Sequence, residues 1–192
     1  MKPVPHEAGK SSYALIDASA FLEALPLLDV RVALDLGCGV GNYTLPMARH
    51  LPPGARLQGI DLWEEGVSTL TRAAAEQGLA NVTAAVGDLT DLDGVPDGQI
   101  DLVLMATVLH DLVERGHARA ALAEAARVLR PGGCLAVVEF KKISTTPGPP
   151  VAIRLSPGEL AALVEPAGFT DPRVLDLGPC NYLTLFRRKI SL

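Results

Sequence analysis

The sequence predicts an α/β domain: a mostly parallel β-sheet with helices on both faces. Three observations support this prediction. Strand-like and helix-like segments alternate along most of the chain, three glycines follow the first strand at alternate positions, and residues 101–109 (DLVLMATVL) are apolar on both faces. A strand that is apolar on both sides is typical of the centre of a parallel sheet whose two faces are covered by helices.

The first half of the chain predicts three strands, of which the first two are each followed by a helix. The first helix should stop at the PPG sequence, and the second has acidic residues in its first turn and Gly78 after its end. The expected elements are strands at 32–36, 56–60 and 81–86, a helix that ends near 51, and a helix at 64–77.

The second half predicts two more steps of this kind and then a change of direction. In the SPGE sequence, Ser156 suits a helix N-cap, Pro157 the first helical position and Glu159 a capping box. The final two strands are separated by only four residues, GPCN, so the last strand must be antiparallel to its neighbour. The expected elements are strands at 101–109, 134–140, 173–177 and 182–189, a helix at 117–129, and a helix from 157 to about 165.

The composition indicates one globular domain and disfavours several function classes. The chain has 192 residues, 48% of them hydrophobic, and a net charge of −5 without a basic block, which argues against a nucleic-acid partner. Cys38, Cys134 and Cys180 form no CxxC pattern, so neither a zinc site nor a disulfide framework is expected. Reduced thiols, no signal-peptide pattern and no apolar stretch of membrane-spanning length lead us to expect a cytoplasmic protein.

The glycine stretch LDLGCGVG should form a ligand loop, because ligands of such sheets bind at the carboxyl ends of the strands. A dinucleotide site has the spacing G-x-G-x-x-G, whereas this loop reads G-x-G-x-G with Asp35 two residues before it. A carboxylate there would repel a pyrophosphate but suits an ammonium group. Asp61 is placed to accept hydrogen bonds from ribose hydroxyls, and Asp88 could bind the exocyclic amine of a base. S-adenosylmethionine has all of these features.

Five motifs, in order over roughly residues 30–140, carry a family resemblance: LDLGCGVG, GIDLW, VGDLTDL, DLVLMATVLHDL and LRPGGCLAVVEF. Together they resemble the class I S-adenosylmethionine-dependent methyltransferases, in particular the small-molecule branch that includes the ubiquinone/menaquinone biosynthesis methyltransferases. The resemblance implies a Rossmann-like seven-stranded sheet of order 3-2-1-4-5-7-6. It also implies one methyltransferase domain over residues 1–192, with an N-terminal helical or lid segment (1–29), a cofactor-binding core (30–140) and a substrate-side loop, helix and hairpin (141–192).

The resemblance also implies roles for individual residues. Asp35 would hold the methionine amino group and Asp61 the ribose hydroxyls, while Asp88 would bind the adenine amine. The glycine loop and Ala106 would contact the cofactor through their backbones, and Leu62 would pack on the adenine beside the Leu89 amide. The full set of implied cofactor-binding residues is Asp35, Gly37, Cys38, Gly39, Gly41, Asp61, Leu62, Asp88, Leu89 and Ala106.

Methyl transfer from a sulfonium needs neither a metal nor an oxyanion hole, because charge is dispersed in the reaction. Orientation of the acceptor and exclusion of water supply most of the catalysis, and a base is needed only if the acceptor must lose a proton. His110 is the candidate base; alternatively, it shapes the pocket or caps a helix. Asp111 is expected to be a helix N-cap. Lys10 and Tyr13 lie in a segment that either covers the cofactor or packs at the sheet edge.

The sequence therefore predicts methyl transfer to a small-molecule acceptor, with S-adenosylhomocysteine as product and no metal. Two alternatives stay open: a nicotinamide-dependent oxidoreductase on a similar fold, and a cofactor-binding protein without catalysis. A protein or RNA acceptor is disfavoured by the acidic charge and by the lack of an added recognition domain. The N-terminal segment or the terminal hairpin could pair two chains in a homodimer, and the acceptor itself is not predicted.

Overall fold

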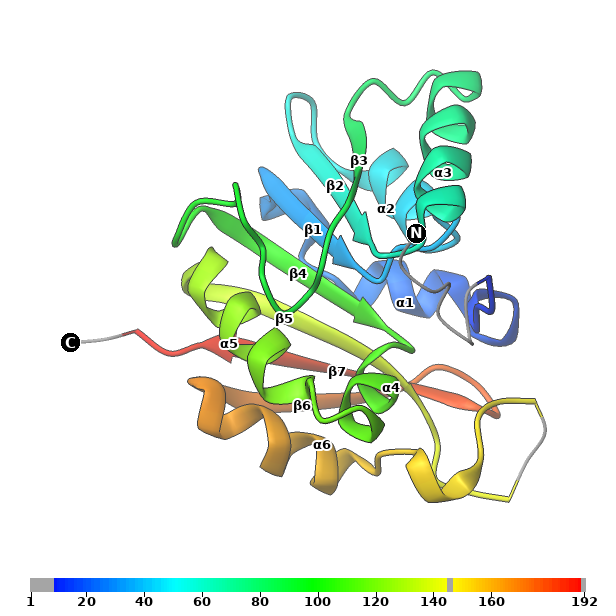
Figure 1. The fold of residues 1–192 in the computed structure, drawn as a ribbon, viewed down its shortest axis with the longest axis vertical. Helices are drawn as coiled ribbons and strands as arrows, with labels where there is room; N and C mark the ends of the chain where they lie inside the picture. The colour runs from blue at the N-terminus through cyan, green and yellow to red at the C-terminus, as the bar shows by residue number, and fades with distance from the viewer. Residues whose placement is uncertain (1–8, 145–146, 191–192) are drawn as a thin grey trace.

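The computed structural model describes residues 9–144 and 147–190. Its centre is a seven-stranded sheet of order β3-β2-β1-β4-β5-β7-β6, which confirms the predicted fold class (Figure 1). The strands are β1 (Val32–Leu36), β2 (Arg56–Asp61), β3 (Val82–Val86), β4 (Ile100–Ala106), β5 (Leu129–Phe140), β6 (Phe169–Asp176) and β7 (Asn181–Arg188).

The first five strands are parallel, and β7 is antiparallel to both of its neighbours, β5 and β6. The antiparallel last strand follows from the short connection after β6, as the sequence predicts. Strand order reverses between β1 and β4, so the carboxyl ends of these two strands flank the position where such sheets bind ligands.

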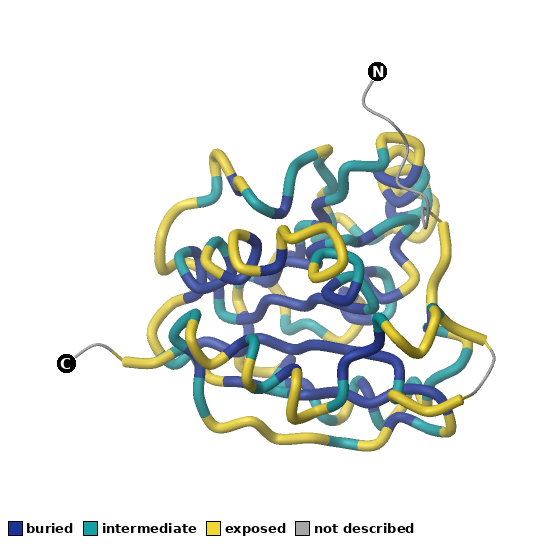
Figure 2. The backbone as a smooth tube through the Cα atoms, turned by 60° about the horizontal axis from the view of Figure 1, so that its bottom comes forward, coloured by how far each residue is buried: buried dark blue, intermediate teal, exposed yellow. Residues whose placement is uncertain are grey.

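Helices cover both faces of the sheet, and two apolar clusters fill the space between the layers (Figure 1). Neighbouring strand residues alternate between the clusters: Leu34 and Val103 pack with α4, α5 and α6, whereas Ala33 and Leu102 pack with α1 and α2. Figure 2 shows the buried central strands enclosed by exposed turns. The helices are α1 (Ala18–Ala24), α2 (Thr44–His50), α3 (Glu64–Glu76), α4 (Leu109–Glu114), α5 (Ala118–Val128) and α6 (Pro157–Val164), with 3-10 turns η1 (Tyr13–Leu15), η2 (Leu27–Asp29), η3 (Val151–Ile153) and η4 (Glu165–Ala167).

The structure corrects several expected element boundaries. The strand expected at 101–109 ends at Ala106, because Thr107 has a positive φ of 52° that breaks the strand, and α4 begins at Leu109. Asp111 therefore lies inside the first turn of α4, and the N-cap position belongs to Val108, so the N-cap prediction for Asp111 was wrong. The fifth strand begins at Leu129, five residues earlier than expected, with an irregular register opposite the start of β4.

Other local predictions are confirmed. Ser156 and Glu159 form the expected capping box at the start of α6, with Pro157 in the first turn. Gly78 follows the C-cap residue Gln77 of α3, as expected, with a φ of 68°. None of the helices within the described ranges reaches the length and apolar character that crossing a membrane requires.

Candidate active site

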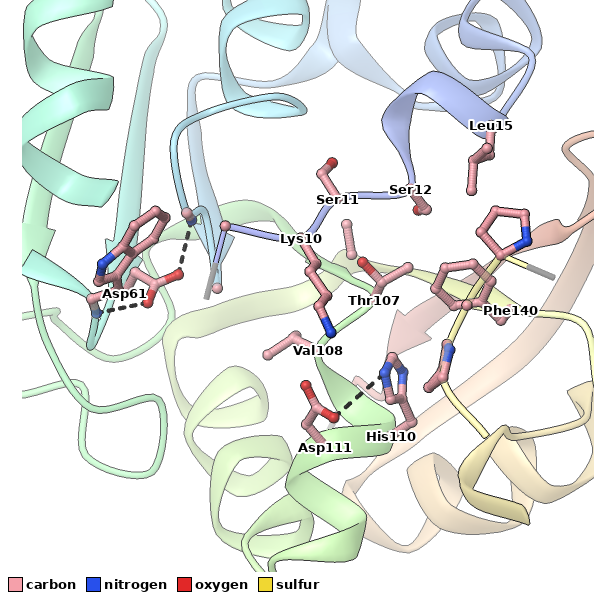
Figure 3. Close-up of a pocket in the computed structure, with 18 of the residues that line it drawn as sticks. Lys10, Ser11, Ser12, Leu15, Asp61, Thr107, Val108, His110, Asp111 and Phe140 are labelled. Atoms are coloured by element: carbon pink, nitrogen blue, oxygen red, sulfur yellow. Dashed lines mark hydrogen bonds and ion pairs between the residues drawn. The ribbon is translucent and has the colours of Figure 1, made fainter. Parts of the chain in front are cut away.

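A cavity of about 550 Å³ lies at the carboxyl ends of β1, β2, β4 and β5. Its volume is in the range that holds a drug-sized ligand. Figure 3 shows Asp61 at one end of the cavity and His110 with Phe140 at the other, with the Lys10 side chain pointing between them. The cavity is lined by residues 9–12, Leu15, Gly37, Gly39, Asp61, Trp63, 106–108, His110, Asp111, Phe140 and 147–150.

Asp61 fixes the loop that forms one end of this cavity. Its Oδ2 atom accepts a hydrogen bond from the Gly39 amide at 2.8 Å, and its Oδ1 atom accepts one from the Trp63 amide at 2.8 Å. The side chain is half-buried, so its remaining acceptor capacity faces the cavity that it lines. A carboxylate held by two amides in this way is a fixed acceptor for hydroxyl groups of a ligand.

The glycine loop lets a ligand approach the backbone. Gly39 has a φ of 50°, and a Cβ atom at this position would meet no other atom within 4 Å, so its free side opens toward the cavity that it lines. Gly41 has a different role: a Cβ atom there would lie 2.4 Å from the Leu70 side chain, so glycine permits the loop to pack against α3. The loop thus combines an open approach to the ligand with close packing behind it.

Asp35 lies behind the glycine loop, with 1% of its surface exposed. The Thr44 hydroxyl donates a hydrogen bond to its Oδ2 atom at 2.6 Å. Burial raises the pKa of Asp35 to about 7, the Thr44 hydrogen bond acts in the opposite direction, and the charge of Asp61 adds to the increase. Asp35 and Cys38 line a small pocket next to the cavity, and Gly37, Gly39 and Ala106 are common to both.

His110 and Glu139 form a buried pair at the other end of the cavity. Glu139 has no exposed surface, and its Oε2 atom lies 2.7 Å from Nδ1 of His110. The backbone amide of His110 also donates to Oε1 of Glu139, at 3.1 Å. On its other side, the imidazole Nε2 lies 3.5 Å from Oδ1 of Asp111. A buried imidazole held by a carboxylate can take up and release a proton.

Arg154 organises the loop that follows β5. Its side chain is buried, its Nε atom donates to the Pro149 carbonyl at 2.8 Å, and its Nη1 atom donates to the carbonyls of Lys141 and Ile143 at 3.2 and 3.0 Å. The guanidinium also lies 5.6 Å from the ring centroid of Phe140, a cation–π distance. These contacts of Arg154 hold the loop after β5 in place, so that its residues 147–150 line the cavity.

The N-terminal segment lines a further side of the cavity, through residues 9–12 and Leu15. The hydroxyl groups of Ser12 and Tyr43 are 2.7 Å apart and hydrogen-bonded, and the Tyr13 ring packs edge-on against Tyr43 and Phe21. Burial raises the pKa of Tyr43, so its hydroxyl keeps its proton at neutral pH. These contacts place Lys10 and Ser11 over the glycine loop (Figure 3).

The structure brings together some of the residues singled out from the sequence and separates others. Gly37, Gly39, Asp61, Ala106 and His110 line the cavity. Asp35 and Cys38 line the small adjoining pocket, and Gly41 packs against α3. The lining of the cavity does not include Leu62, Asp88 or Leu89.

Leu62, Asp88 and Leu89 lie near the ends of β2 and β3. Asp88 is half-buried, and its Oδ1 atom accepts hydrogen bonds from the amide and the hydroxyl of Thr90, at 2.9 and 2.7 Å. Leu89 is buried in the apolar core, whereas Leu62 is partly exposed. Their roles toward a ligand stay predictions.

Sequence reasoning missed Glu139, Val108 and the contacts of Arg154, whereas the loop at 147–150 falls within the substrate-side segment (141–192) that the resemblance implied. Glu139 had a usable signal, because it is the one carboxylate in the apolar run CLAVVEF, and a buried carboxylate needs a partner. The contacts of Arg154 had none, because they depend on how the loop after β5 folds around its side chain.

Comparison with known proteins agrees with this geometry. A family model described as a methyltransferase domain matches residues 33–133. Nocamycin O-methyltransferase of Saccharothrix syringae is 34% identical over 167 residues, which are 80% of this chain and 55% of that protein. A ubiquinone/menaquinone biosynthesis C-methyltransferase of Geobacter sulfurreducens is 31% identical over 56% of this chain and 41% of that protein.

A solved structure of an S-adenosylmethionine-dependent methyltransferase from Aquifex aeolicus shares the whole fold. It superposes with a TM-score of 0.83 at 26% identity, over 92% of each chain. The chain spans about half the length of the curated relatives it matches.

Proposed function

Because this chain belongs to the methyltransferase domain family, of the class I S-adenosylmethionine-dependent type, we propose that it transfers a methyl group from S-adenosylmethionine to a small-molecule acceptor. One observation carries the proposal: a single cavity joins the glycine loop and Asp61 at one end to His110 and Phe140 at the other. Such a cavity can hold a cofactor and an acceptor next to each other.

The described residues fit the cofactor at three points. Asp61 offers a carboxylate whose position is fixed by the amides of Gly39 and Trp63, which suits the two ribose hydroxyls. The open side of Gly39 lets the cofactor approach the backbone. Asp35, next to the same loop, would hold the methionine amino group directly or through a water molecule.

The remaining contacts are proposed from the family resemblance. Asp88 and the Leu89 amide would bind the adenine edge, Leu62 would pack on the ring, and the Ala106 backbone would contact the methionyl chain. Ala106 lines the cavity, which supports its role. The role of Asp88 requires its carboxylate to bind adenine in addition to the Thr90 groups that it already accepts from.

When bound, the cofactor supplies a methyl group on a positively charged sulfur, which makes the methyl carbon open to in-line displacement. The chain's own contribution is to orient the acceptor and to exclude water. Leu15, Phe140 and Pro149 are among the apolar residues that line the cavity, so a compact and largely apolar acceptor fits best. His110, which lines the same cavity, would accept a proton from that molecule.

The N-terminal segment is proposed to act as a lid. Residues 9–12 line the cavity, and the Ser12–Tyr43 hydrogen bond ties them to the end of the glycine loop. Covering of the cavity by this segment would exclude water from the reacting groups. Thus residues 9–29 would form the lid of one domain predicted over residues 1–192; residues 1–8 of the predicted lid segment lie outside the described residues.

We further propose a cytoplasmic enzyme that uses no metal and no nucleic-acid partner. Three free cysteines and an acidic net charge support this proposal. A homodimer would pair the N-terminal segment or the terminal hairpin of two chains.

Calorimetric titration tests the proposed function. The wild-type chain is expected to bind S-adenosylmethionine and S-adenosylhomocysteine, but not NAD. Asp61→Ala should weaken both affinities at least tenfold, because hydrogen bonds to a charged group contribute about 1.5–3 kcal/mol. Asp93→Ala is the matched control, since Asp93 is an exposed residue that does not line the cavity. Binding of NAD alone would indicate an oxidoreductase; cofactor binding without turnover of any acceptor would indicate the non-catalytic alternative.

A further inference from the structure

Glu139 is a fully buried carboxylate near the carboxyl end of the apolar strand β5. Removing a carboxylate from water costs several kcal/mol unless it is paired and hydrogen-bonded. Its two oxygens are both directed at His110, one at the ring nitrogen Nδ1 and one at the backbone amide. The two hydrogen bonds with His110 therefore account for the burial of the Glu139 carboxylate.

The contact with Glu139 determines which ring nitrogen of His110 carries the proton. An ionised carboxylate only accepts hydrogen bonds, so Nδ1 must be the donor at its 2.7 Å distance from Oε2. In the neutral ring, the lone pair is then on Nε2, the nitrogen on the side of Asp111, which lines the cavity. The second hydrogen bond, from the His110 amide, prevents the carboxylate from rotating away.

Charged groups of both signs surround the His110 ring. Glu139 lies against Nδ1, and Asp111 of α4 lies 3.5 Å from Nε2, so two carboxylates face the imidazole. Two cations are in the same surroundings: Lys10 points into this part of the cavity, and the Arg154 guanidinium stacks on the Phe140 ring, which packs edge-on against His110 (Figure 3).

A base of this kind is useful to only some acceptors. A neutral amine can attack without first losing a proton, and a thiolate or carboxylate is already deprotonated. A neutral hydroxyl group must lose its proton as it attacks, and a well-placed base accelerates that step by about 10²–10⁴-fold. The Phe140 ring, which packs edge-on beside His110 and lines the cavity, can contact the apolar body of such an acceptor.

We propose that Glu139 is a positioning residue that holds His110 with Nε2 as the proton acceptor on the cavity side, and that the acceptor of the methyl transfer is a neutral hydroxyl compound. This inference rests on the proposed function. In the step, the hydroxyl proton passes to Nε2, and an electron pair of the acceptor forms the bond to the methyl carbon. The bond between that carbon and sulfur breaks and leaves its electron pair on sulfur. The proton then leaves the imidazolium for solvent.

The test uses nitrogen-15 NMR of the imidazole rings in the full chain saturated with S-adenosylhomocysteine. His110 is assigned by comparison with His110→Gln. Phenol is the acceptor probe, and anisole, in which the hydroxyl is already methylated, is its matched control. The variants are Glu139→Gln, which keeps the shape and removes the charge, and the exposed Glu165→Gln as control. Thermal unfolding and calorimetry of each variant check folding and cofactor affinity.

In the wild type, neutral His110 is expected to carry its proton on Nδ1, and phenol, but not anisole, should shift the Nε2 resonance. Glu139→Gln should lower the pH midpoint of the His110 titration by at least one unit, a tenfold change in proton affinity, with S-adenosylhomocysteine affinity changed less than twofold. A side chain that merely fills space would leave tautomer and midpoint unaltered.

Three results would overturn the inference: a proton on Nε2 in the neutral wild-type ring, an unchanged midpoint in Glu139→Gln, or no phenol-specific shift at Nε2. Failure of the proposed function looks different. In that case the wild type would not bind S-adenosylhomocysteine, while the tautomer and the effect of Glu139→Gln could still be measured on the chain alone.

Discussion

Asp35 links the glycine loop to the pH dependence of stability. Its pKa is about 7 in the folded chain because of burial, against an ordinary value of 3.8. Between these two pH values the folded chain holds a proton that the unfolded chain has released, so stability must fall as pH rises through this window. At ~1.4 kcal/mol for each unit of pKa, the loss is about 4 kcal/mol by pH 8.

Asp35→Asn should remove this loss, because the amide keeps the shape and cannot ionise. We expect the variant to be more stable than the wild type at pH 8 by a few kcal/mol, with the difference vanishing near pH 4. Urea unfolding from pH 4 to 8 measures this. A difference that is the same at every pH would contradict the assignment to Asp35.

Asp101 provides a control of opposite sign. Burial raises its pKa, but hydrogen bonds from Arg130 and the amides of Val32 and Arg31 outweigh burial, so its net pKa is lowered. The stability that Asp101 provides is present above its ordinary pKa and is lost as pH falls. Asp101→Asn should therefore lose stability relative to the wild type near neutral pH, where Asp35→Asn gains it.

Single residues of the site were predictable where they directly follow a predicted strand. Asp61 and the glycines follow predicted strands, so their gathering at one sheet edge could be foreseen. The Glu139–His110 contact could not, because it joins two residues 29 positions apart, and His110 follows the turn at Thr107, whose φ is positive. A threonine carries no sequence signal for that conformation.

At the scale of elements, the loop after β5 depends on one side chain. Arg154 donates to the carbonyls of Pro149, Lys141 and Ile143, and these acceptors would be left unpaired without it. Arg154→Met should lower the free energy of unfolding by ~3 kcal/mol. It should also increase hydrogen exchange over residues 141–144 and 147–153, with little effect on S-adenosylhomocysteine affinity.

Hydrogen exchange followed by mass spectrometry measures the loop, and calorimetry measures the affinity. Arg119→Met is the matched control, since Arg119 lies on an exposed position of α5. Equal exchange in Arg154→Met and Arg119→Met would show that the loop does not depend on the guanidinium.

Most element types were predictable because the periodicities are strong, whereas helix α4, the end of β4 and the starts of β5 and β6 were not. The apolar run DLVLMATVL continues past the end of β4, and its last residue already belongs to α4. Apolar character alone cannot distinguish a buried strand from the first turn of a buried helix. The strand predicted at 134–140 begins at Leu129 instead, and the RPGG sequence lies within β5 where its pairing with β4 is irregular.

At the scale of the whole molecule, cofactor binding should stabilise the fold. A ligand at 100 times its dissociation constant adds ~2.7 kcal/mol to the free energy of unfolding. For a chain of this size, this corresponds to a rise in Tm of about 5–10 °C. Differential scanning fluorimetry with S-adenosylhomocysteine measures the shift, which should be much smaller in Asp61→Ala at the same concentration. An equal shift with NAD would contradict the choice of cofactor.

The overall topology was only partly accessible from physical patterns. The short GPCN connection determined that the last two strands are antiparallel. Nothing in the pattern of residues determined that the last strand lies between β5 and β6; that order followed from the family resemblance. Either strand of the terminal hairpin could pair with β5 without breaking a local rule. Only packing across the whole sheet determines which of the two strands does so.

The position of β7 has a consequence for how this chain emerges from the ribosome. β6 is synthesised before β7, yet it must stop short of β5 and leave a space one strand wide, ~5 Å. Until residues 181–188 enter that space, β5 presents an open row of amide and carbonyl groups, the kind of edge that recruits strands from other chains. The nascent protein is therefore most exposed to aggregation immediately before its last strand is translated, and the sheet closes only after synthesis has passed Arg188.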